Sequence, residues 1–373
     1  MEANMTFLRR RNLLSSALLG AIGGTVGGSA KAATLQYPQL TNAAISVLHP
    51  TNAYFVTGAN AGPRVLAGGQ KGLIIYSDNG GQSWHQAKVP FSGTITSIAF
   101  ASAKVGWATG ELGVILKTED GGENWVKQLD GIAEIALMNT ATQAYVAAQE
   151  PGSDNADRAT RRAKILTSQG PDKPFLSLLP ISETEIFAFG AYRFAEHSTD
   201  GGKSWTDWSM NIDDPVSHNI YDAANINGAY YLVSEASLIF KSTDGGRTFP
   251  KLAQPGNATF FGITDTGAGG ILAYGVAGEI YLSTDQGKTW TQPNFTGQSN
   301  INTISALPGS GLLVAGDAGG GLWISKDHGN SFVLANRNPI MSINDLVPLG
   351  PMGFLLVTSV GVFAVPDMTK MHH

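Results

Sequence analysis

The sequence predicts an all-β fold in which one supersecondary unit repeats around a single ring. Three observations lead to this prediction: a short turn pattern recurs six times, the copies are almost evenly spaced, and apolar stretches of strand length flank the copies. Fixed periods of this size are typical of propellers, solenoids and repeat arrays. Strand-rich units with frequent turn signals favour a β-propeller of four-stranded blades, whose radial closure protects the edges of its sheets.

The recurring pattern is Ser-x-Asp-x-Gly-x-Thr-Trp, an Asp box, and residues 283–290 are its clearest copy. The aspartate can accept hydrogen bonds from its own turn, the glycine supplies a positive φ, and the aromatic residue packs back on the hairpin. The six copies place Asn79, Asp120, Asp200, Asp244, Asp285 and Asp327 at the aspartate position, and Trp84, Trp125, Trp205, Phe249, Trp290 and Phe332 at the aromatic position. We interpret each box as a structural clasp that performs no chemistry.

The spacing of the boxes leaves the number of blades open. Successive aromatic positions lie 41, 80, 44, 41 and 42 residues apart. Because 80 is close to two periods, we expect a degenerate unit near residue 165, with 164–175 as its candidate. The C-terminal unit, 343–365, offers three strands, and an N-terminal strand at 44–48 would supply the fourth and close the ring. Counting strands allows eight blades, or seven if the degenerate unit belongs to a blade with an insertion.

The N-terminus has the features of an export signal. Three arginines at 9–11 precede a glycine-rich apolar run, and Ala-Lys-Ala at 30–32 offers a cleavage site. The paired arginines resemble a twin-arginine signal, which exports folded proteins. We therefore expect a signal peptide (1–33), a propeller (34–367) and a C-terminal tail (368–373), with a periplasmic or thylakoid-lumenal location.

Charge and composition exclude several classes of function. The chain has 24 Lys and Arg against 29 Asp and Glu, a formal net charge of −5. Signal cleavage would leave 20 basic and 28 acidic residues, a net charge of −8, which is unfavourable for binding nucleic acid. The absence of cysteine excludes disulfides, thiolate metal sites and a cysteine nucleophile. No catalytic or phosphate-loop motif is present, so we expect no catalytic residue and no cofactor.

Residues 106–125 carry a family resemblance. Gly-Trp-Ala-Thr-Gly at 106–110 runs through a short turn and strand into the second box, and this combination is more specific than the box alone. With it, the chain resembles the photosystem II stability and assembly factor family and its relatives in non-photosynthetic bacteria. The resemblance implies a seven-bladed propeller that acts as an assembly chaperone. Such a protein binds membrane-complex subunits or assembly intermediates from the lumenal or periplasmic side, without spanning the membrane itself, and we expect it to be a monomer.

Two unusual loops, 150–162 and 211–219, are expected on the face opposite the boxes, where long loops on a rigid scaffold carry binding residues. The first holds three of the seven arginines that remain after signal cleavage. The predicted partner-binding residues are Arg158, Arg161, Arg162 and Lys164. This patch could dock an acidic segment of a partner, and the alternative is that the charges are merely solvated.

The second loop could also be read as a metal site. Its potential ligands are Asp213, Asp214, His218 and Asp222. Their spacing matches no known metal loop, and a turn that begins at Asp-Pro explains them equally well. We therefore predict no metal site.

The alternative function is a carbohydrate-active or glycan-binding Asp-box propeller. A sialidase is excluded because Arg64, before the first box, is followed by Val-Leu and has its proline on the wrong side. A glycosidase that uses two carboxylates stays open, with Asp213 and Glu235 as one possible pair.

Overall fold

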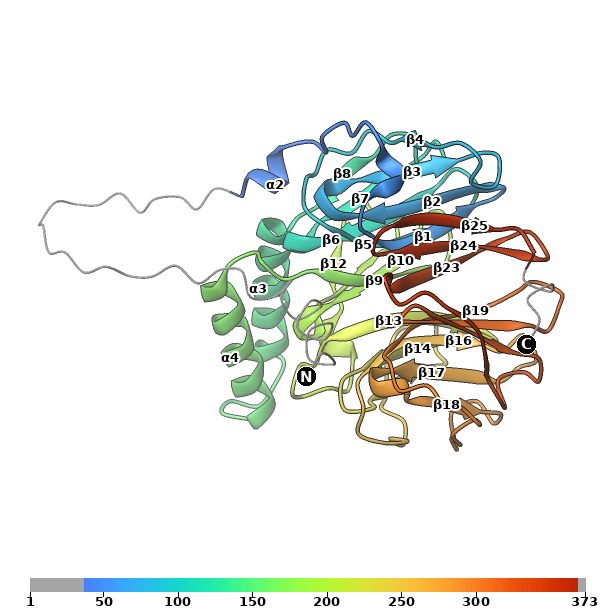
Figure 1. The fold of residues 1–373 in the computed structure, drawn as a ribbon. Helices are drawn as coiled ribbons and strands as arrows, with labels where there is room; N and C mark the ends of the chain where they lie inside the picture. The colour runs from blue at the N-terminus through green and yellow to red at the C-terminus, as the bar shows by residue number, and fades with distance from the viewer. Residues whose placement is uncertain (1–36, 368–373) are drawn as a thin grey trace, which may run out of the picture.

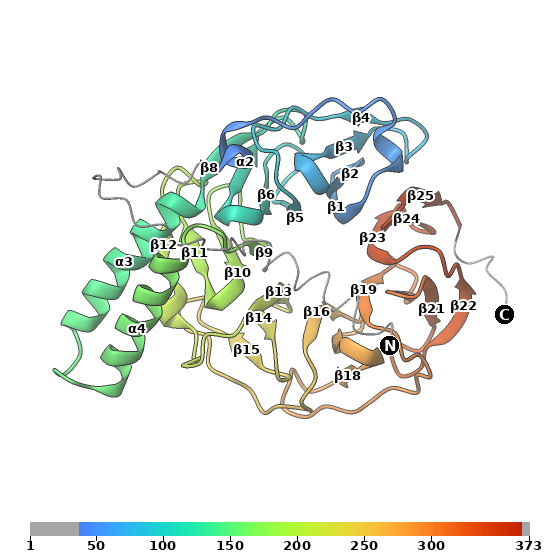
Figure 2. The same cartoon turned by 60° about the vertical axis from the view of Figure 1, so that its left-hand side comes forward.

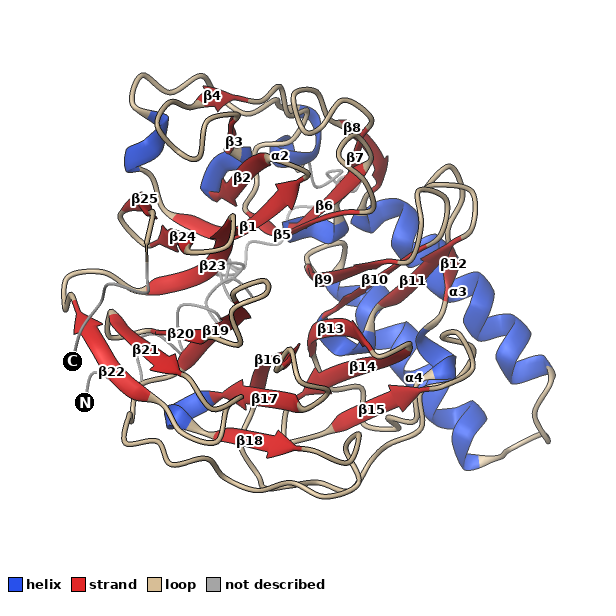
Figure 3. Cartoon of the chain, turned by 90° about the vertical axis from the view of Figure 1, so that its right-hand side faces the viewer, coloured by secondary structure: helices blue, strands red, loops and turns tan. Residues whose placement is uncertain are grey.

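The computed structural model describes residues 37–367, which form seven antiparallel sheets arranged around a ring (Figures 1 and 3). The first sheet contains β1 (Phe55–Ala61), β2 (Arg64–Gly69), β3 (Ile74–Ser77) and β4 (His85–Gln86). The second contains β5 (Ile95–Phe100), β6 (Gly106–Gly110), β7 (Ile115–Thr118) and β8 (Val126–Leu129). The third contains β9 (Phe175–Pro180), β10 (Ile186–Gly190), β11 (Ala195–Ser198) and β12 (Thr206–Asp207).

The remaining four sheets have three or four strands. The fourth contains β13 (Ile220–Ile226), β14 (Ala229–Ser234) and β15 (Ile239–Ser242), and the fifth β16 (Phe260–Asp265), β17 (Ile271–Gly275) and β18 (Ile280–Ser283). The sixth contains β19 (Ile301–Ala306), β20 (Leu313–Asp317), β21 (Gly321–Ser325) and β22 (Val333–Arg337), and the seventh β23 (Ile343–Leu349), β24 (Gly353–Thr358) and β25 (Gly361–Val365).

The helices lie between or beside these strands. The α-helices are α2 (Pro38–Thr41), α3 (Gly131–Ala147) and α4 (Asp154–Gln169). The 3-10 turns are η1 (Pro50–Asn52), η2 (Gln70–Gly72), η3 (Glu111–Gly113), η4 (Ala191–Arg193), η5 (Ser209–Asn211) and η6 (Val276–Gly278). Of the helices that the structure describes, none combines the length and apolar character needed to cross a membrane.

The first strand of each sheet lies innermost, because first strands of neighbouring sheets contact one another all the way around the ring, including β1 with β23. In all seven sheets the first strand also has one extra residue in its pairing with the second strand, such as Val56 in β1 and Leu176 in β9. The core lies between adjacent sheets. One apolar cluster, for example, joins Leu66 and Ile74 of the first sheet to Ile98, Leu116 and Trp125 of the second sheet and its box. The all-β propeller prediction is confirmed in this respect.

In the first six sheets, an Asp box follows the third strand and leads to the outer edge of the sheet, and it is held by one repeated set of hydrogen bonds. In the box at 283–290, Ser283 Oγ accepts from the N–H of Gly287 at 2.8 Å and donates to Asp285 Oδ1 at 2.9 Å. Asp285 then accepts from both the N–H and the hydroxyl of Thr289, at 2.9 and 2.6 Å. Asn79 makes equivalent contacts with Ser77 and Ser83, so no charge is needed for the turn itself.

The predictions of a degenerate unit near residue 165 and of a loop at 150–162 are both wrong. A helical hairpin, α3 and α4, stands there instead, between the second and third sheets and outside the ring (Figures 1 and 2). Its local causes are visible in the sequence: Asp130 caps α3 by accepting from the N–H of Ile132, and Ser153 caps α4 by accepting from the N–H of Ala156. The hairpin is nearly as long as one repeat, which explains the spacing of 80 residues. The described residues form seven sheets, one fewer than the alternative count of eight blades.

The predicted closure by an N-terminal strand is not seen among the described residues. Residues 44–48 form no strand, and their hydrogen bonds go to the first sheet: the N–H of Val47 donates to Gln86 Oε1 at 3.0 Å, and Gln86 Nε2 donates to the carbonyl of Ile45 at 2.8 Å. The seventh sheet keeps three strands. The predicted signal peptide (1–33) and the C-terminal tail (368–373) lie outside the described residues.

Candidate partner-binding pocket

The structure brings both candidate segments to one pocket. A pocket of about 720 Å³ lies between α4 on one side and residues 192–193 and 210–217 on the other. Arg158, Arg161 and Arg162 all line it, so three of the four predicted binding residues meet the second loop here. Lys164 is exposed on α4 but is not among the lining residues.

The mouth of the pocket is cationic and partly apolar. Arg158 and Arg161 are exposed on one face of α4, because residues three apart on a helix are neighbours. Arg158 Nη2 donates to Asn155 Oδ1 at 2.8 Å, whereas Arg161 has no hydrogen bond or ion pair within the described chain. Ile165 is 47% exposed on the same face, and Val216 is 72% exposed across the pocket. A ligand at this mouth would meet two guanidinium groups beside apolar surface.

The floor of the pocket is made by two buried arginines that hold the neighbouring loop. Arg162 donates through Nε and Nη2 to the carbonyl of Tyr192 at 3.2 and 2.9 Å, and Arg193 donates to the carbonyl of Asp214. Burial lowers the pKa of Arg193 to about 10 and also lowers the pKa of Arg162. A pKa of about 10 leaves Arg193 charged at neutral pH. Arg162, one of the predicted partner-binding residues, is 9% exposed, and its hydrogen bonds hold η4.

The loop that carries Tyr192 and Arg193 repeats a left-handed turn that also follows the second strand in other sheets, as at Lys71–Gly72 and Ala236–Ser237. Tyr192 and Arg193 both have positive φ, 53° and 59°, which side chains other than glycine rarely adopt. Two contacts hold this conformation: the N–H of Tyr192 donates to Asn219 Oδ1 at 2.9 Å, and the N–H of Arg193 donates to the carbonyl of His218 at 2.8 Å. These two contacts hold Tyr192, which is 37% exposed, at the edge of the pocket.

The residues once considered as metal ligands are separated. Asp214 is buried and accepts from the N–H and the Nδ1 of His218 at 2.6 and 2.9 Å, so it shapes its own loop. Asp213 is exposed on the rim. Asp222 lies in the central channel, where it accepts from the N–H of Ile263 at 3.1 Å and from the hydroxyl of Ser177 at 3.1 Å. The structure therefore agrees with a turn at 213–218 in place of a cation loop.

The central channel forms a second, larger pocket of about 1050 Å³ around the innermost strands. Glu235 lines this channel and accepts from Asn219 Nδ2 at 2.9 Å. Asp213 lines the other pocket, so the two carboxylates considered for a hydrolase do not share a site.

Comparison with known proteins identifies the repeat. The family model described as photosynthesis system II assembly factor YCF48 matches residues 57–144, and the model described as BNR/Asp-box repeat matches residues 281–292. The resemblance to this assembly-factor family is confirmed. No curated protein sequence matches the chain.

Solved structures agree on the fold of this assembly-factor-like propeller. YCF48 bound to a D1 peptide has a TM-score of 0.60 and 14% identity, over 84% of this chain and 93% of that one. YCF48 from Cyanidioschyzon merolae has a TM-score of 0.58 and 14% identity, over 84% of this chain and 96% of that one. A GH74 xyloglucanase from Xanthomonas campestris gives 0.58 and 13%, over 86% of this chain but 53% of that one. At these identities the likeness establishes the propeller fold alone.

Sequence reasoning found the arginines but missed the residues that shape their surroundings. Tyr192 and Arg193 follow the strand Ile186–Gly190 and lie in an ordinary-looking turn, and nothing in the local sequence marks the positive φ values. The helix signal was available: Ala156, Ala159, Ala163 and Leu166 are the buried face of α4, at spacings of three and four residues.

Proposed function

We propose that the protein is an exported, non-enzymatic assembly scaffold that binds a subunit of a membrane protein complex on the lumenal or periplasmic side. The observation that carries the proposal is the pocket beside α4, where Arg158 and Arg161 stand exposed next to Ile165, Tyr192 and Val216. The match of residues 57–144 to the YCF48 assembly-factor model supports this class of function. A propeller of this fold with a bound D1 peptide supports a protein segment as the ligand.

The charge of the pocket indicates what kind of segment it would bind. Four arginines and two aspartates line it, so it is cationic in a chain whose formal net charge is −5. Such local contrast attracts an acidic partner and orients it before contact. The exposed apolar side chains at the mouth suit a segment in which acidic and apolar residues alternate, and guanidinium groups bind carboxylates with paired hydrogen bonds.

The test compares two charge reversals on one helix. The double variant Arg158→Glu and Arg161→Glu removes both exposed cations of the mouth, and Lys164→Glu reverses a cation of α4 that does not line the pocket. The probe is a fluorescent peptide of alternating Glu and Leu, with Gln in place of Glu as the matched control. Hydrogen bonds to charged groups contribute about 1.5–3 kcal/mol each, so we expect at least a roughly tenfold loss of affinity in the double variant.

Fluorescence anisotropy measures the binding, and thermal melting serves as the control for folding. Lys164→Glu should bind almost as the unchanged protein does, and the Glu peptide should bind more weakly as salt screens the attraction. Equal affinity of the double variant and the unchanged protein, with equal melting temperatures, would remove the pocket from the proposal.

A further inference from the structure

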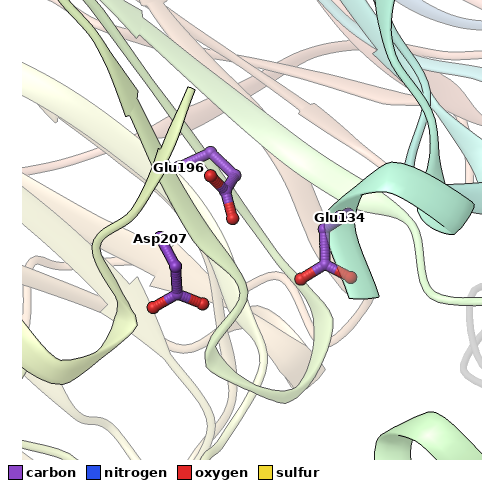
Figure 4. Close-up of side chains that lie close together, drawn as sticks. All are labelled: Glu134, Glu196 and Asp207. Carbon is purple, nitrogen blue, oxygen red and sulfur yellow. The ribbon is translucent and has the colours of Figure 1, made fainter. Parts of the chain in front are cut away.

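Three carboxyl groups converge beneath the helical hairpin, away from the mouth of the pocket. Glu134 lies in the first turn of α3, Glu196 on β11 and Asp207 on β12 (Figure 4). One oxygen of each lies within 4.8 Å of the others. Glu196 and Asp207 are direct partners across the two strands, a pairing in which like charges oppose each other and destabilise the sheet.

The carboxyl groups lack the contacts that usually compensate burial. Glu134 and Glu196 are both 0% exposed, and none of their four oxygens has a hydrogen-bond partner. Asp207 accepts from the N–H and hydroxyl of Ser209 at 3.1 and 2.7 Å through Oδ1, and its Oδ2 has no partner. Burying a charge in this way is costly unless it is paired or coordinates a metal, so these five oxygens point to a missing positive ligand.

The nearby arginines do not act as the missing positive ligand. Arg162 and Arg193 act electrostatically on the cluster, but neither forms an ion pair with the three acids, and their hydrogen bonds to oxygen go to the carbonyls of Tyr192 and Asp214. Arg162 Nη1 and Arg193 Nε are buried without a hydrogen-bond partner of their own. Lys173 also acts electrostatically on Glu134, but it forms an ion pair with Asp172. With Asp214 included, four carboxyl groups, three of them on buried residues, face two guanidinium groups. Two negative charges are thus in excess if all four groups are ionised, the amount that one divalent cation would neutralise.

We propose that Glu134, Glu196 and Asp207 bind a calcium ion that ties the helical hairpin to the third sheet. Oxygen ligands select a hard cation over zinc or copper. Three carboxylates can offer up to six oxygens, which suits the six to eight ligands and the 2.3–2.6 Å bonds of Ca²⁺, and oxygens on opposite sides of such an ion lie about 4.6–5.2 Å apart. Mg²⁺ keeps several waters and normally takes one or two carboxylates, which a trio with two fully buried glutamates does not favour. This site does not depend on the proposed partner.

The first experiment uses the full-length protein after removal of metal with EDTA and dialysis. Calorimetric titration with CaCl₂ should show one bound ion per chain, and the melting temperature should rise with calcium concentration, because an ion that binds only the folded state stabilises it. Glu196→Gln should lose this calcium-dependent rise. Glu183→Gln, which changes an exposed acid in the turn between β9 and β10, is the matched control and should keep it.

A second variant and a second readout keep the test decisive. If Glu196→Gln fails to fold, Glu134→Gln, which changes the ligand on α3, takes its place in the test. Hydrogen exchange on the unchanged protein should show calcium-dependent protection in α3, β11 and β12. Protection confined to other elements would overturn the site, as would a rise in melting temperature with Mg²⁺ or Mn²⁺ but none with Ca²⁺. No response to any of the three ions would mean that the cluster holds protons instead, since burial raises the pKa of Glu134 to about 8.

Discussion

At the scale of single residues, the box aspartates combine a structural role with a titratable charge. Hydrogen bonds from the hydroxyls of Ser204, Thr248 and Thr289 are the main reason that the pKa of Asp200, Asp244 and Asp285 falls to about 2. The folded state therefore prefers the ionised form of these three side chains. Their stabilising contribution is present above about pH 4 and is lost as the pH falls toward 2.

This pKa difference predicts a specific acid response. The free energy of unfolding should decrease between about pH 4 and pH 2, and the triple variant Asp200→Asn, Asp244→Asn, Asp285→Asn should show a shallower decrease. Asn79 shows that an amide fits the turn, so the variant should fold. Urea unfolding at a series of pH values measures the slope, and identical slopes for both proteins would mean that the boxes do not titrate as described.

At the scale of secondary-structure elements, the α3–α4 hairpin is an insertion whose two ends meet. A Cβ added at Gly131 would lie 2.8 Å from Pro171 Cβ, so the chain leaves the second sheet and re-enters the ring at almost the same place. The hairpin nevertheless packs on the third sheet, where Met138 and Leu166 belong to the same buried cluster as Phe175 and Ile186. It is an appended element with its own anchoring contacts.

Removing the hairpin should therefore leave the propeller folded. We expect a chain that joins residue 131 to residue 171 through two glycines to retain its β circular-dichroism spectrum and a cooperative transition. Its melting temperature should be lower, because buried Met138 and Leu166 contacts are lost. It should also lose binding of the Glu–Leu peptide and any response to calcium. Failure of the shortened chain to fold would show that the hairpin is an integral part of the ring.

The same elements show what sequence alone could reach. The boxes and the strand at Gly106–Gly110 were predictable because turn residues and apolar alternation are local signals. The hairpin was missed because its length imitates the repeat period and its arginine-rich surface looks like a solvated loop. The convergence of Glu134 with Glu196 and Asp207 was beyond reach, since it joins residues more than sixty positions apart through tertiary packing.

At the scale of the whole molecule, the ring closes by packing of its first sheet against its last. The N–H of Gly58 donates to Asp345 Oδ2 at 2.8 Å, and Asn344 Nδ2 donates to the carbonyl of Phe55 at 2.6 Å. Phe55 and Leu355 share one buried cluster across this junction. The N-terminal strand predicted to complete the last sheet was reasonable from its apolar residues, but the side chain of Gln86 holds that segment at the edge of the first sheet.

The pocket lies beside the helical hairpin, and the central channel lies among the innermost strands. The seven sheets form the ring, and the helical hairpin lies at its outer edge (Figure 2). The basic mouth of the pocket lies where α4 meets residues 192–193 and 210–217. Tyr192 and Ser217 line both this pocket and the central channel, so the two spaces adjoin each other.

The most direct test of the central claim is affinity capture from detergent-solubilised membranes of the source organism, with the unchanged protein, the Arg158→Glu and Arg161→Glu double variant and the Lys164→Glu control as parallel baits. Quantitative mass spectrometry of the captured proteins is the measurement. We predict that the unchanged protein and the Lys164→Glu control enrich one integral-membrane subunit, or an assembly intermediate that contains it, and that the double variant does not. Equal enrichment by all three baits, or no membrane subunit with any of them, would contradict an assembly scaffold that binds through this pocket.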